Sequence, residues 1–358
     1  MDQNRICYVG VDFGTFKTSV ACSNGRREVV PTAVGWPKDH VSRSLVGRDV
    51  VFGKDLQEFR LALNVVRPFE KGVLKYLDHN ELGVSDAKGR QHTEAAKLLL
   101  EHVVAQVRPD DGSLVYGVIG APSRASIKNK QVLLEAARDA FDAVVIVSEP
   151  FTIAYGMNKL SDTLVVDIGA GTIDICPMFG TYPAEEDQVT LPLGGDLIDT
   201  EFLQRLKALY PDVQLTANMA REIKEKYGFV HDVNENAVVT LTANGRPKQY
   251  DVTQPLKDAC QTLVQPIVRG LKELIAKLDP EFQGRMLNNI LLGGGGSQLR
   301  GLDRMIEESL QEFGGGKVTR VYDSVFAGAV GALKLAMSMP QSYWQTMQQV
   351  DQRSRAAA

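Results

Sequence analysis

The chain has 358 residues, of which 44% are hydrophobic and 23% are charged, and its 40 Lys plus Arg nearly balance its 44 Asp plus Glu. These proportions are typical of a globular protein, and the length allows two domains that each bury a core. A net charge of -4 without a long basic run excludes an electrostatic nucleic-acid surface and a polybasic membrane anchor. We therefore expect no nucleic-acid partner and no direct membrane insertion.

The cysteines and the N-terminus indicate the compartment. The four cysteines are spread along the chain, without a Cys-x-x-Cys pair or a histidine at zinc-ligand spacing: Cys7, Cys22, Cys176 and Cys260. We expect buried thiols in a reducing cytoplasm. The first residues lack the charged and apolar regions of a signal peptide, and no apolar run approaches the roughly 18 residues of a membrane helix. The expected localisation is cytoplasmic.

Two segments share one design, in which an apolar strand leads to an aspartate, a glycine-containing turn and a second apolar strand. The first comprises residues 6–12 and 18–22, and the second runs from 162 to 176. Asp12 and Asp167 hold the same place in the two hairpins, 155 residues apart (167 minus 12). This echo predicts two similar folding units made by duplication.

The segments around the hairpins alternate between strand-like and helix-like patterns, which is typical of α/β units. We predict strands over residues 114–120 and 144–147, and helices over 126–141 and 151–160.

Two stretches interrupt this alternation and are predicted to be inserted subdomains. Residues 35–92 are less periodic and rich in Gly, Pro and charge. Residues 217–253 contain a helix candidate and a hairpin with a strong two-residue turn signal, Asn244-Gly245. The boundaries that we predict are residues 1–158 plus 321–339 for lobe I, 159–320 for lobe II and 340–358 for a C-terminal tail.

The turns of both hairpins have the chemistry of a phosphate site. Glycine-rich turns expose successive backbone N–H groups without a Cβ in the way, as a phosphate chain requires. The neighbouring Asp12 and Asp167 suit Mg²⁺, which keeps most of its waters and takes one or two carboxylates. One Asp-x-Gly-Thr turn is often an ordinary hairpin. Two such turns in one chain favour phosphate binding.

A third glycine cluster, residues 293–296, follows the strand-like segment 289–292. Four consecutive glycines remove every side chain from a turn, so a flat ligand such as a purine can lie against the backbone. The alternative is a flexible loop. Neither a P-loop nor a dinucleotide-binding G-x-G-x-x-G pattern in the required context occurs in the chain.

Together, these three motifs resemble the phosphate 1, phosphate 2 and adenosine motifs of the actin, Hsp70 and sugar kinase ATPase superfamily. The resemblance implies an α/β, actin-like ATPase fold with two ribonuclease H-like lobes and ATP with Mg²⁺ in the cleft between them. It assigns Mg²⁺, held largely through water, to Asp12 and Asp167. The phosphate-binding residues that it implies are Gly14, Thr15, Phe16, Lys17, Gly169, Ala170, Gly171 and Thr172. The adenosine-binding residues are Gly195, Asp196, Lys224, Glu225, Gly294, Gly295, Gly296 and Ser297.

The resemblance also implies two catalytic residues, Glu149 and Asp167. Glu149 matches the catalytic position of bacterial actins, and a carboxylate at a strand end can orient the attacking water. Glu149 is also a favourable acid for the first turn of a helix. Two further alternatives stay open at this point. Lys17 either reaches the β-phosphate or is solvated. The segment 221–226, which contains Lys224 and Glu225, could instead be a solvated helix face with i,i+4 charge pairs.

The rest of the chain narrows the choice within the superfamily. An Hsp70-type chaperone needs a further domain, whereas we expect few residues after a helix that ends near Met339. No candidate for the Asp base of a sugar kinase is visible, and residues 1–5 are too short and polar for the membrane anchor of MreB-type actins. The cytoplasmic, filament-forming actins remain.

Several segments resemble the MamK type of magnetosome-associated bacterial actins, namely residues 118–126, 147–151, 167–176, 186–191 and 341–344. The resemblance implies an ATPase that polymerises into cytoplasmic filaments alongside magnetosome membranes, with hydrolysis linked to filament turnover. The implied partners are other copies of the chain and magnetosome-associated adaptor proteins. The alternative is a non-polymerising, actin-like ATP-binding scaffold or assembly protein.

Overall fold

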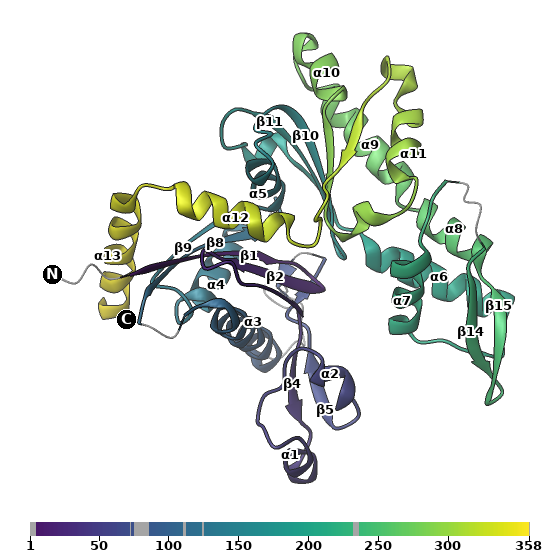
Figure 1. The fold of residues 1–358 in the computed structure, drawn as a ribbon, viewed down its shortest axis with the longest axis horizontal. Helices are drawn as coiled ribbons and strands as arrows, with labels where there is room; N and C mark the ends of the chain where they lie inside the picture. The colour runs from purple at the N-terminus through teal and green to yellow at the C-terminus, as the bar shows by residue number, and fades with distance from the viewer. Residues whose placement is uncertain are drawn as a thin grey trace. The chain divides into compact units, whose positions relative to one another are not determined.

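The structure is a computed structural model that describes residues 5–71, 73–74, 86–109, 112–123, 125–231 and 236–357. The chain divides into two compact units, residues 1–158 with 325–358 and residues 159–324. Each unit is built around a five-stranded sheet (Figure 1).

The sheet of the first unit has the strand order β3-β2-β1-β8-β9. The β1–β2 and β2–β3 pairs are antiparallel, and the β1–β8 and β8–β9 pairs are parallel. The carboxyl ends of β1, β8 and β9 therefore meet at one edge of the sheet. The strands are β1 (Ile6–Phe13), β2 (Lys17–Cys22), β3 (Arg27–Pro31), β8 (Leu114–Ala121) and β9 (Ala143–Ser148).

The sheet of the second unit repeats this plan. Its order is β12-β11-β10-β16-β17, again with two antiparallel pairs followed by two parallel pairs. The prediction of two similar folding units is thus confirmed in strand order and direction. The strands are β10 (Ser161–Ile168), β11 (Ile173–Phe179), β12 (Val189–Leu191), β16 (Ile290–Gly293) and β17 (Val318–Arg320).

Helices cover both faces of the first sheet, because successive side chains of a strand point to opposite faces. Cys7, Val9 and Val11 of β1 belong to a buried cluster with α3 and α4, whereas Gly10 faces the backbone of α12. Figure 1 shows α12 on one side of this sheet and α3 with α4 on the other. The helices are α3 (Asp86–Val107), α4 (Ile127–Ala137), α5 (Glu149–Gly156), α12 (Ala327–Ser338) and α13 (Gln341–Ala357).

A small satellite core between β3 and α3 in the chain consists of Ala33 and residues of the predicted insertion 35–92. Its helix α1 starts with a capping box between Asp39 and Ser42 and ends at Gly47, which adopts a left-handed conformation. The elements are β4 (Val34–Pro37), α1 (His40–Val46), α2 (Asp55–Glu58), β5 (Leu63–Val66), β6 (Phe69–Glu70) and β7 (Val73–Leu74).

The second unit packs its helices with one face of its sheet into a single large cluster of buried side chains. The predicted hairpin is present, with Asn244 and Gly245 both at positive φ between β14 and β15. The helices are α6 (Gly195–Leu209), α7 (Ala217–Tyr227), α8 (Thr253–Gln261), α9 (Val264–Ile275), α10 (Pro280–Leu287) and α11 (Leu302–Ser309). The short elements are β13 (Val213–Gln214), β14 (Val238–Ala243), β15 (Arg246–Asp251), η1 (Glu185–Asp187), η2 (Gly295–Gln298) and η3 (Gln311–Phe313).

Several predicted boundaries differ from the structure. The helix predicted over residues 126–141 ends at Ala137, and Ser126 is its N-cap, accepting a bond from the Asn129 N–H. The helix predicted from residue 151 begins at Glu149 and ends at Gly156, two residues before Asn158 takes a left-handed conformation. The strand predicted to be buried, residues 144–147, is partly exposed because β9 lies at the edge of its sheet.

The segment after residue 340 is helical. Helix α13 belongs to the first unit and packs beside β9. Trp344 is fully buried, stacks on Tyr116 at 5.2 Å between ring centroids and donates its indole N–H to the Ala336 carbonyl. Because Trp344 and Tyr116 are far apart in the sequence, local residue patterns do not predict this contact.

Candidate functional site

The first hairpin presents its turn at the carboxyl edge of the first sheet. Gly14, Thr15 and Phe16 lie between β1 and β2. Thr32, just after β3, supports the turn: its hydroxyl donates to the Gly14 carbonyl at 2.8 Å, and its N–H donates to the Phe16 carbonyl at 2.8 Å. Thr18 contacts the same hydroxyl at 2.8 Å. Sequence reasoning missed both supporting threonines, because nothing in the residues around Thr18 in β2 or Thr32 after β3 marks them as partners of the turn.

Asp12 lies at the end of β1, opposite Gly120 of β8. A Cβ at Gly328, in the first turn of α12, would lie 2.6 Å from the Asp12 Oδ2 atom, so the carboxyl group abuts that helix. Burial raises the pKa of the Asp12 carboxyl to about 7. A cation bound beside this buried carboxyl group would favour its ionised form.

The raised pKa predicts how the nucleotide-free protein responds to Asp12→Asn. The native state keeps a proton that the unfolded chain releases above pH 3.8, so the wild-type protein loses stability as the pH rises towards about 7. We expect Asp12→Asn to change the free energy of unfolding little at pH 4.5 and to raise it by on the order of 2 kcal/mol at pH 8. Urea unfolding at both pH values measures this, and an equal change at the two values would contradict the assignment.

Glu149 lies at the same edge of the sheet as Asp12, after the strand that pairs with the other side of β8. It follows β9 directly and forms the first turn of α5, with 7% of its surface exposed. The row Asp12–Gly120–Val147 crosses the three parallel strands, and a Cβ at Gly120 would lie 3.4 Å from the Glu149 Cγ. The structure thus places Asp12 and Glu149 at the same edge of the sheet, at the ends of β1 and β9, with Gly120 of β8 between these two strands.

The second hairpin has an equivalent turn that is joined to a helix N-terminus. Asp167 is the last residue of β10 that pairs with β16, opposite Gly293, and within the turn the Gly169 N–H bonds to the Thr172 carbonyl at 2.9 Å. At the start of α6, Gly195 donates its N–H to the Gly169 carbonyl at 3.0 Å, and Asp196 donates to Ala170 at 2.8 Å. These bonds fix the turn against the positive end of the helix.

The glycine cluster after β16 packs against the same hairpin. Gly294 has a φ of +72°, and a Cβ there would lie 2.4 Å from Asp167 Oδ1, so a side chain is excluded for both reasons. The Ser297 hydroxyl is buried and donates to the Gly294 carbonyl at 2.7 Å, so it holds the loop. Gly295 has no neighbouring atom within 4 Å of its Cβ position and leaves the backbone open.

Helix α7 reaches the same region through two buried cations. Lys224 Nζ lies 2.7 Å from Asp199 Oδ1 and 2.9 Å from the Gly195 carbonyl, and Arg221 Nε lies 2.8 Å from Asp199 Oδ2. The side chains of Lys224 and Arg221 are only 12% and 15% exposed, so the interpretation as a solvated face is wrong for these two. It holds for Glu225, which is exposed. Asp199 was missed from the sequence because nothing local marks it as a partner.

Removal of the central carboxylate should break the ion pair of Lys224 and leave Arg221 paired with Asp196, 2.9 Å away. We expect Asp199→Asn to lower the free energy of unfolding by about 3 kcal/mol, because the largely buried Lys224 loses its counter-charge and Arg221 loses one of two. It should also weaken nucleotide binding if Lys224 contacts the nucleotide. Asp258→Asn is the matched control, since its ion pair with Arg205 is 4.0 Å long and exposed, and should change stability by less than about 0.5 kcal/mol. Urea titrations of the three proteins measure this; equal stabilities would remove Asp199 from this role.

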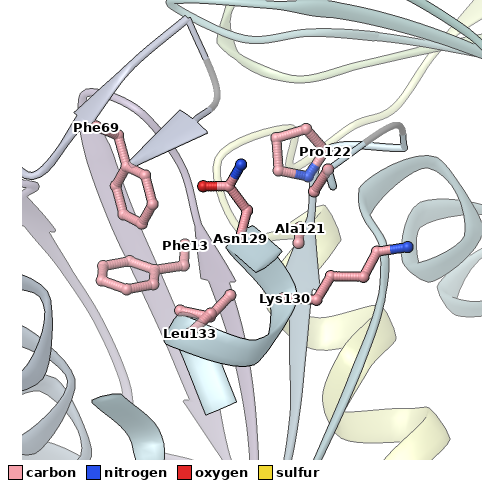
Figure 2. Close-up of a pocket in the computed structure, with 8 residues that line it drawn as sticks. Phe13, Phe69, Ala121, Pro122, Asn129, Lys130 and Leu133 are labelled. Atoms are coloured by element: carbon pink, nitrogen blue, oxygen red, sulfur yellow. The ribbon is translucent and has the colours of Figure 1, made fainter. Parts of the chain in front are cut away.

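A small pocket opens beside the first hairpin (Figure 2). Figure 2 shows Phe13 and Phe69 on one side of it, Ala121 and Pro122 on the other, and Asn129 between them. The pocket lining is mostly apolar and offers no phosphate cradle. Its residues come from β1, β6, β8, α4 and the loop before α4, and they also include Ala125, Lys130 and Leu133. Because these segments are far apart in the sequence, local patterns did not reveal the pocket.

Each unit offers one carboxylate beside its glycine turn as a candidate cation ligand. The carboxylates at the two turns are Asp12 and Asp167, each beside a turn with a threonine hydroxyl, and Mg²⁺ uses one or two such groups. Within the described ranges, no three His, Cys, Asp or Glu side chains gather as a metal-binding group. Over the same described part of the chain, no helix has the length and apolarity needed to cross a bilayer.

Comparison with known proteins gives the class that this fold and these hairpins define. The family model described as MreB/Mbl protein matches residues 7–339, and the chain belongs to this family of actin-like proteins. Within it, the chain is 38% identical over 345 residues to the actin-like protein MamK of Paramagnetospirillum magneticum, covering 96% of each chain. It is also 38% identical over 342 residues to MamK of Magnetospirillum gryphiswaldense, covering 96% of this chain and 92% of that one.

Solved structures agree with this relationship. A MamK double helical filament superposes with a TM-score of 0.88 at 39% identity, covering 94% of this chain and all of that chain. A non-polymerising MamK mutant bound to AMPPNP gives a TM-score of 0.71 with the same identity and coverage. MreB5 of Spiroplasma citri bound to ADP shares the fold at 17% identity, with a TM-score of 0.74. The predicted actin-like α/β fold is therefore confirmed.

Proposed function

We propose that this protein binds and hydrolyses Mg-ATP and polymerises into filaments. One observation supports nucleotide binding. The two sheets have the same strand order, and the equivalent strands β1 and β10 carry Asp12 and Asp167 next to their ends, each beside a turn with glycine and threonine. The full-length similarity to MamK, which is solved both as a filament and with AMPPNP, supports the combination of nucleotide binding and assembly.

The proposed chemistry assigns a role to each turn. Backbone N–H groups of residues 14–17 and 169–172 hold the phosphates of one ATP, and Asp12 and Asp167 hold Mg²⁺ largely through its water ligands. When bound, the cation neutralises the charge on the transferred phosphoryl group. The Glu149 carboxylate accepts a hydrogen bond from the attacking water and orients it in line with the γ-phosphorus atom. Catalysis then rests on positioning and preorganised charge.

The adenosine end is proposed to contact α7 and the glycine loop. The Gly295 backbone is unobstructed and can lie against a flat base. Lys224 already bonds the Gly195 carbonyl and Asp199, so its ammonium is fixed beside the start of α6. The exposed Glu225 can turn towards the ribose. Gly294, Gly296 and Ser297 are proposed to shape this loop, since their close contacts are within the protein.

We propose that the filaments form in the cytoplasm alongside magnetosome membranes and organise these organelles into a chain through adaptor proteins. The support is the 38% identity over nearly the whole length of two MamK proteins. Filament turnover follows if nucleotide state changes the contacts between subunits, because a ligand shifts a conformational equilibrium only by its differential affinity. A head-to-tail contact between copies extends into an open polymer.

Helix α1 is proposed to contribute to that contact. Ser42 and Val46 face the satellite core, whereas Val41 and Leu45, four residues apart on the opposite side, are 64% and 67% exposed. Paired exposed apolar side chains on a small subdomain are typical of an interaction surface.

Charges on this surface should block assembly without affecting the nucleotide. We expect Val41→Glu with Leu45→Glu to raise the critical concentration for polymerisation at least about tenfold, because each charge must be desolvated in the contact. Pelleting with Mg-AMPPNP measures this, together with binding of a fluorescent ATP analogue. Ile127→Glu, on a residue 73% exposed at the start of α4, is the matched control. Unchanged pelleting of the double variant would place the contact elsewhere.

The alternative is an actin-like scaffold that binds ATP without assembling. Analytical ultracentrifugation over a wide range of protein concentration, with Mg-AMPPNP, Mg-ADP or no nucleotide, separates the two. Nucleotide-dependent polymer supports the filament proposal. A monomer that binds the nucleotide at every concentration supports the scaffold.

A further inference from the structure

Two thiols face each other at the open end of the first hairpin. Cys7 lies near the start of β1, and Cys22 ends β2 opposite Val9. Their Sγ atoms are 3.2 Å apart, although the residues are 15 positions apart in the sequence. Cys7 and Cys22 are 4% and 2% exposed. The hairpin register, which the sequence alone does not give, brings the two residues together.

The backbone holds this pair in place. Cys7, Val9 and Cys22 point to the same face of the sheet, into the buried cluster beneath α3. Just after Cys22, the Ser23 N–H still bonds the Tyr8 carbonyl at 2.9 Å, so the strands stay paired beside the cysteines. The Cys22 carbonyl accepts the Gly25 N–H at 2.9 Å, which closes the tight turn into β3. The two sulfur atoms therefore meet within a fixed hairpin.

We propose that Cys7 and Cys22 form an oxidation site, at which a hydroperoxide converts the two facing thiols into an intramolecular disulfide. The sulfur of Cys22 attacks the terminal peroxide oxygen, the O–O bond breaks and the alcohol or water leaves, which gives a sulfenic acid. The sulfur of Cys7 then attacks the Cys22 sulfur and displaces water. The sum is two thiols and one hydroperoxide giving one disulfide, one alcohol and one water, or two waters from hydrogen peroxide.

The pKa of Cys22 is lowered, whereas those of Cys176 and Cys260 are raised, so the thiol of Cys22 is the more reactive. The hydrogen bond from Cys7, together with backbone N–H groups of Asn24 and Ser23, lowers the pKa of Cys22 to about 6. The thiolate is the reactive form of cysteine, and Cys7 already contacts it as the resolving thiol. Burial raises the pKa of Cys176 and raises that of Cys260 to about 12, so both stay as inert thiols.

The crosslink leaves the turn of the hairpin free. A disulfide requires the sulfur atoms to approach to about 2.05 Å, a shift of roughly 1 Å that side-chain rotation can supply. The pairs Val9–Cys22 to Phe13–Thr18 separate the cysteines from Gly14. The proposal therefore stands independently of nucleotide binding.

Peptide mapping of the full-length protein tests the site. Trypsin cuts after Arg5, Lys17 and Arg26, so Cys7 and Cys22 fall in separate peptides, residues 6–17 and 18–26. After exposure to hydrogen peroxide, alkylation under denaturing conditions and non-reducing digestion, we expect these peptides to be joined in more than about half of the molecules. Dithiothreitol should separate them. The peptides with Cys176 and Cys260 should carry the alkyl group throughout.

Two variants and one gel complete the test. Cys22→Ser should abolish the joined peptide, and Cys260→Ser, also at a buried thiol, should leave it unchanged. If Cys7 and Cys22 of the wild-type protein are both fully alkylated after exposure to millimolar peroxide, the proposal is overturned, whatever the variants show. A dithiothreitol-sensitive dimer on a non-reducing gel, or Cys22 found as a sulfinic acid beside alkylated Cys7, would also overturn it.

Discussion

Glu149→Gln is expected to lower the steady-state rate of ATP hydrolysis by about 10² to 10³-fold while polymer still forms. The carboxamide keeps the volume of a side chain that is 7% exposed, so the fold should persist, but it is a poor acceptor for the proton of the attacking water. ATP then stays bound in the polymer, and filaments should outlast those of the wild type. Phosphate release and pelleting of the same samples measure both effects.

Two further variants control this result. Glu149→Ala should match the glutamine variant in lost hydrolysis, with an added stability cost from the cavity. Glu135→Gln, on the exposed side of α4, should hydrolyse ATP at the wild-type rate. Equal steady-state hydrolysis by the wild type and both Glu149 variants would remove Glu149 from the catalytic role and leave it as a first-turn acid of α5.

Gly331→Ala is expected to lower the free energy of unfolding by about 4 kcal/mol or more, the largest stability effect that we predict. Helices α5 and α12 cross so closely that a Cβ at residue 331 would lie 1.8 Å from the Thr152 carbonyl oxygen. That oxygen belongs to the backbone, so only a shift of one helix can make room. Because Glu149 begins α5 and Asp12 abuts α12, the shift should also disturb the site.

The matched control is a glycine in a helix with free space around it. Gly284 lies in α10, is exposed and has no atom within 4 Å of its Cβ position, so Gly284→Ala should raise stability by about 0.5 to 1 kcal/mol. Thermal unfolding of the two variants beside the wild type gives the comparison. Similar melting temperatures for all three would show that α5 and α12 do not pack as closely as this structure has them.

Local patterns were sufficient to predict the framework of the site. The alternation of apolar residues and the glycine turns placed both hairpins, and the strand at residues 114–121 was found to within one residue. These features depend on neighbours in the sequence: a strand has a period of two, and a turn needs particular residues at particular places. Asp12, Glu149 and Asp167 could therefore be assigned to strand ends from the amino-acid sequence alone.

The parts that were missed depend on partners far along the chain. Thr32 supports the Gly14 turn from the residue after β3, and Asp199 pairs with Lys224 and Arg221 of a helix that begins 18 residues later (217 minus 199). The Cys7–Cys22 contact needs the register of the hairpin, because a slip of one residue would turn one thiol to the other face. The residue pattern within one segment does not predict contacts with another segment.

The central claim is that one protein both hydrolyses ATP and assembles, and simultaneous light scattering and phosphate release test it most directly. On addition of Mg-ATP to the purified wild-type protein, we predict that scattering rises, phosphate follows, and scattering falls once ATP is consumed. The Glu149→Gln variant should give the rise without the fall. Phosphate release without any change in scattering, over a wide range of protein concentration, would contradict the account, as would scattering that does not depend on nucleotide.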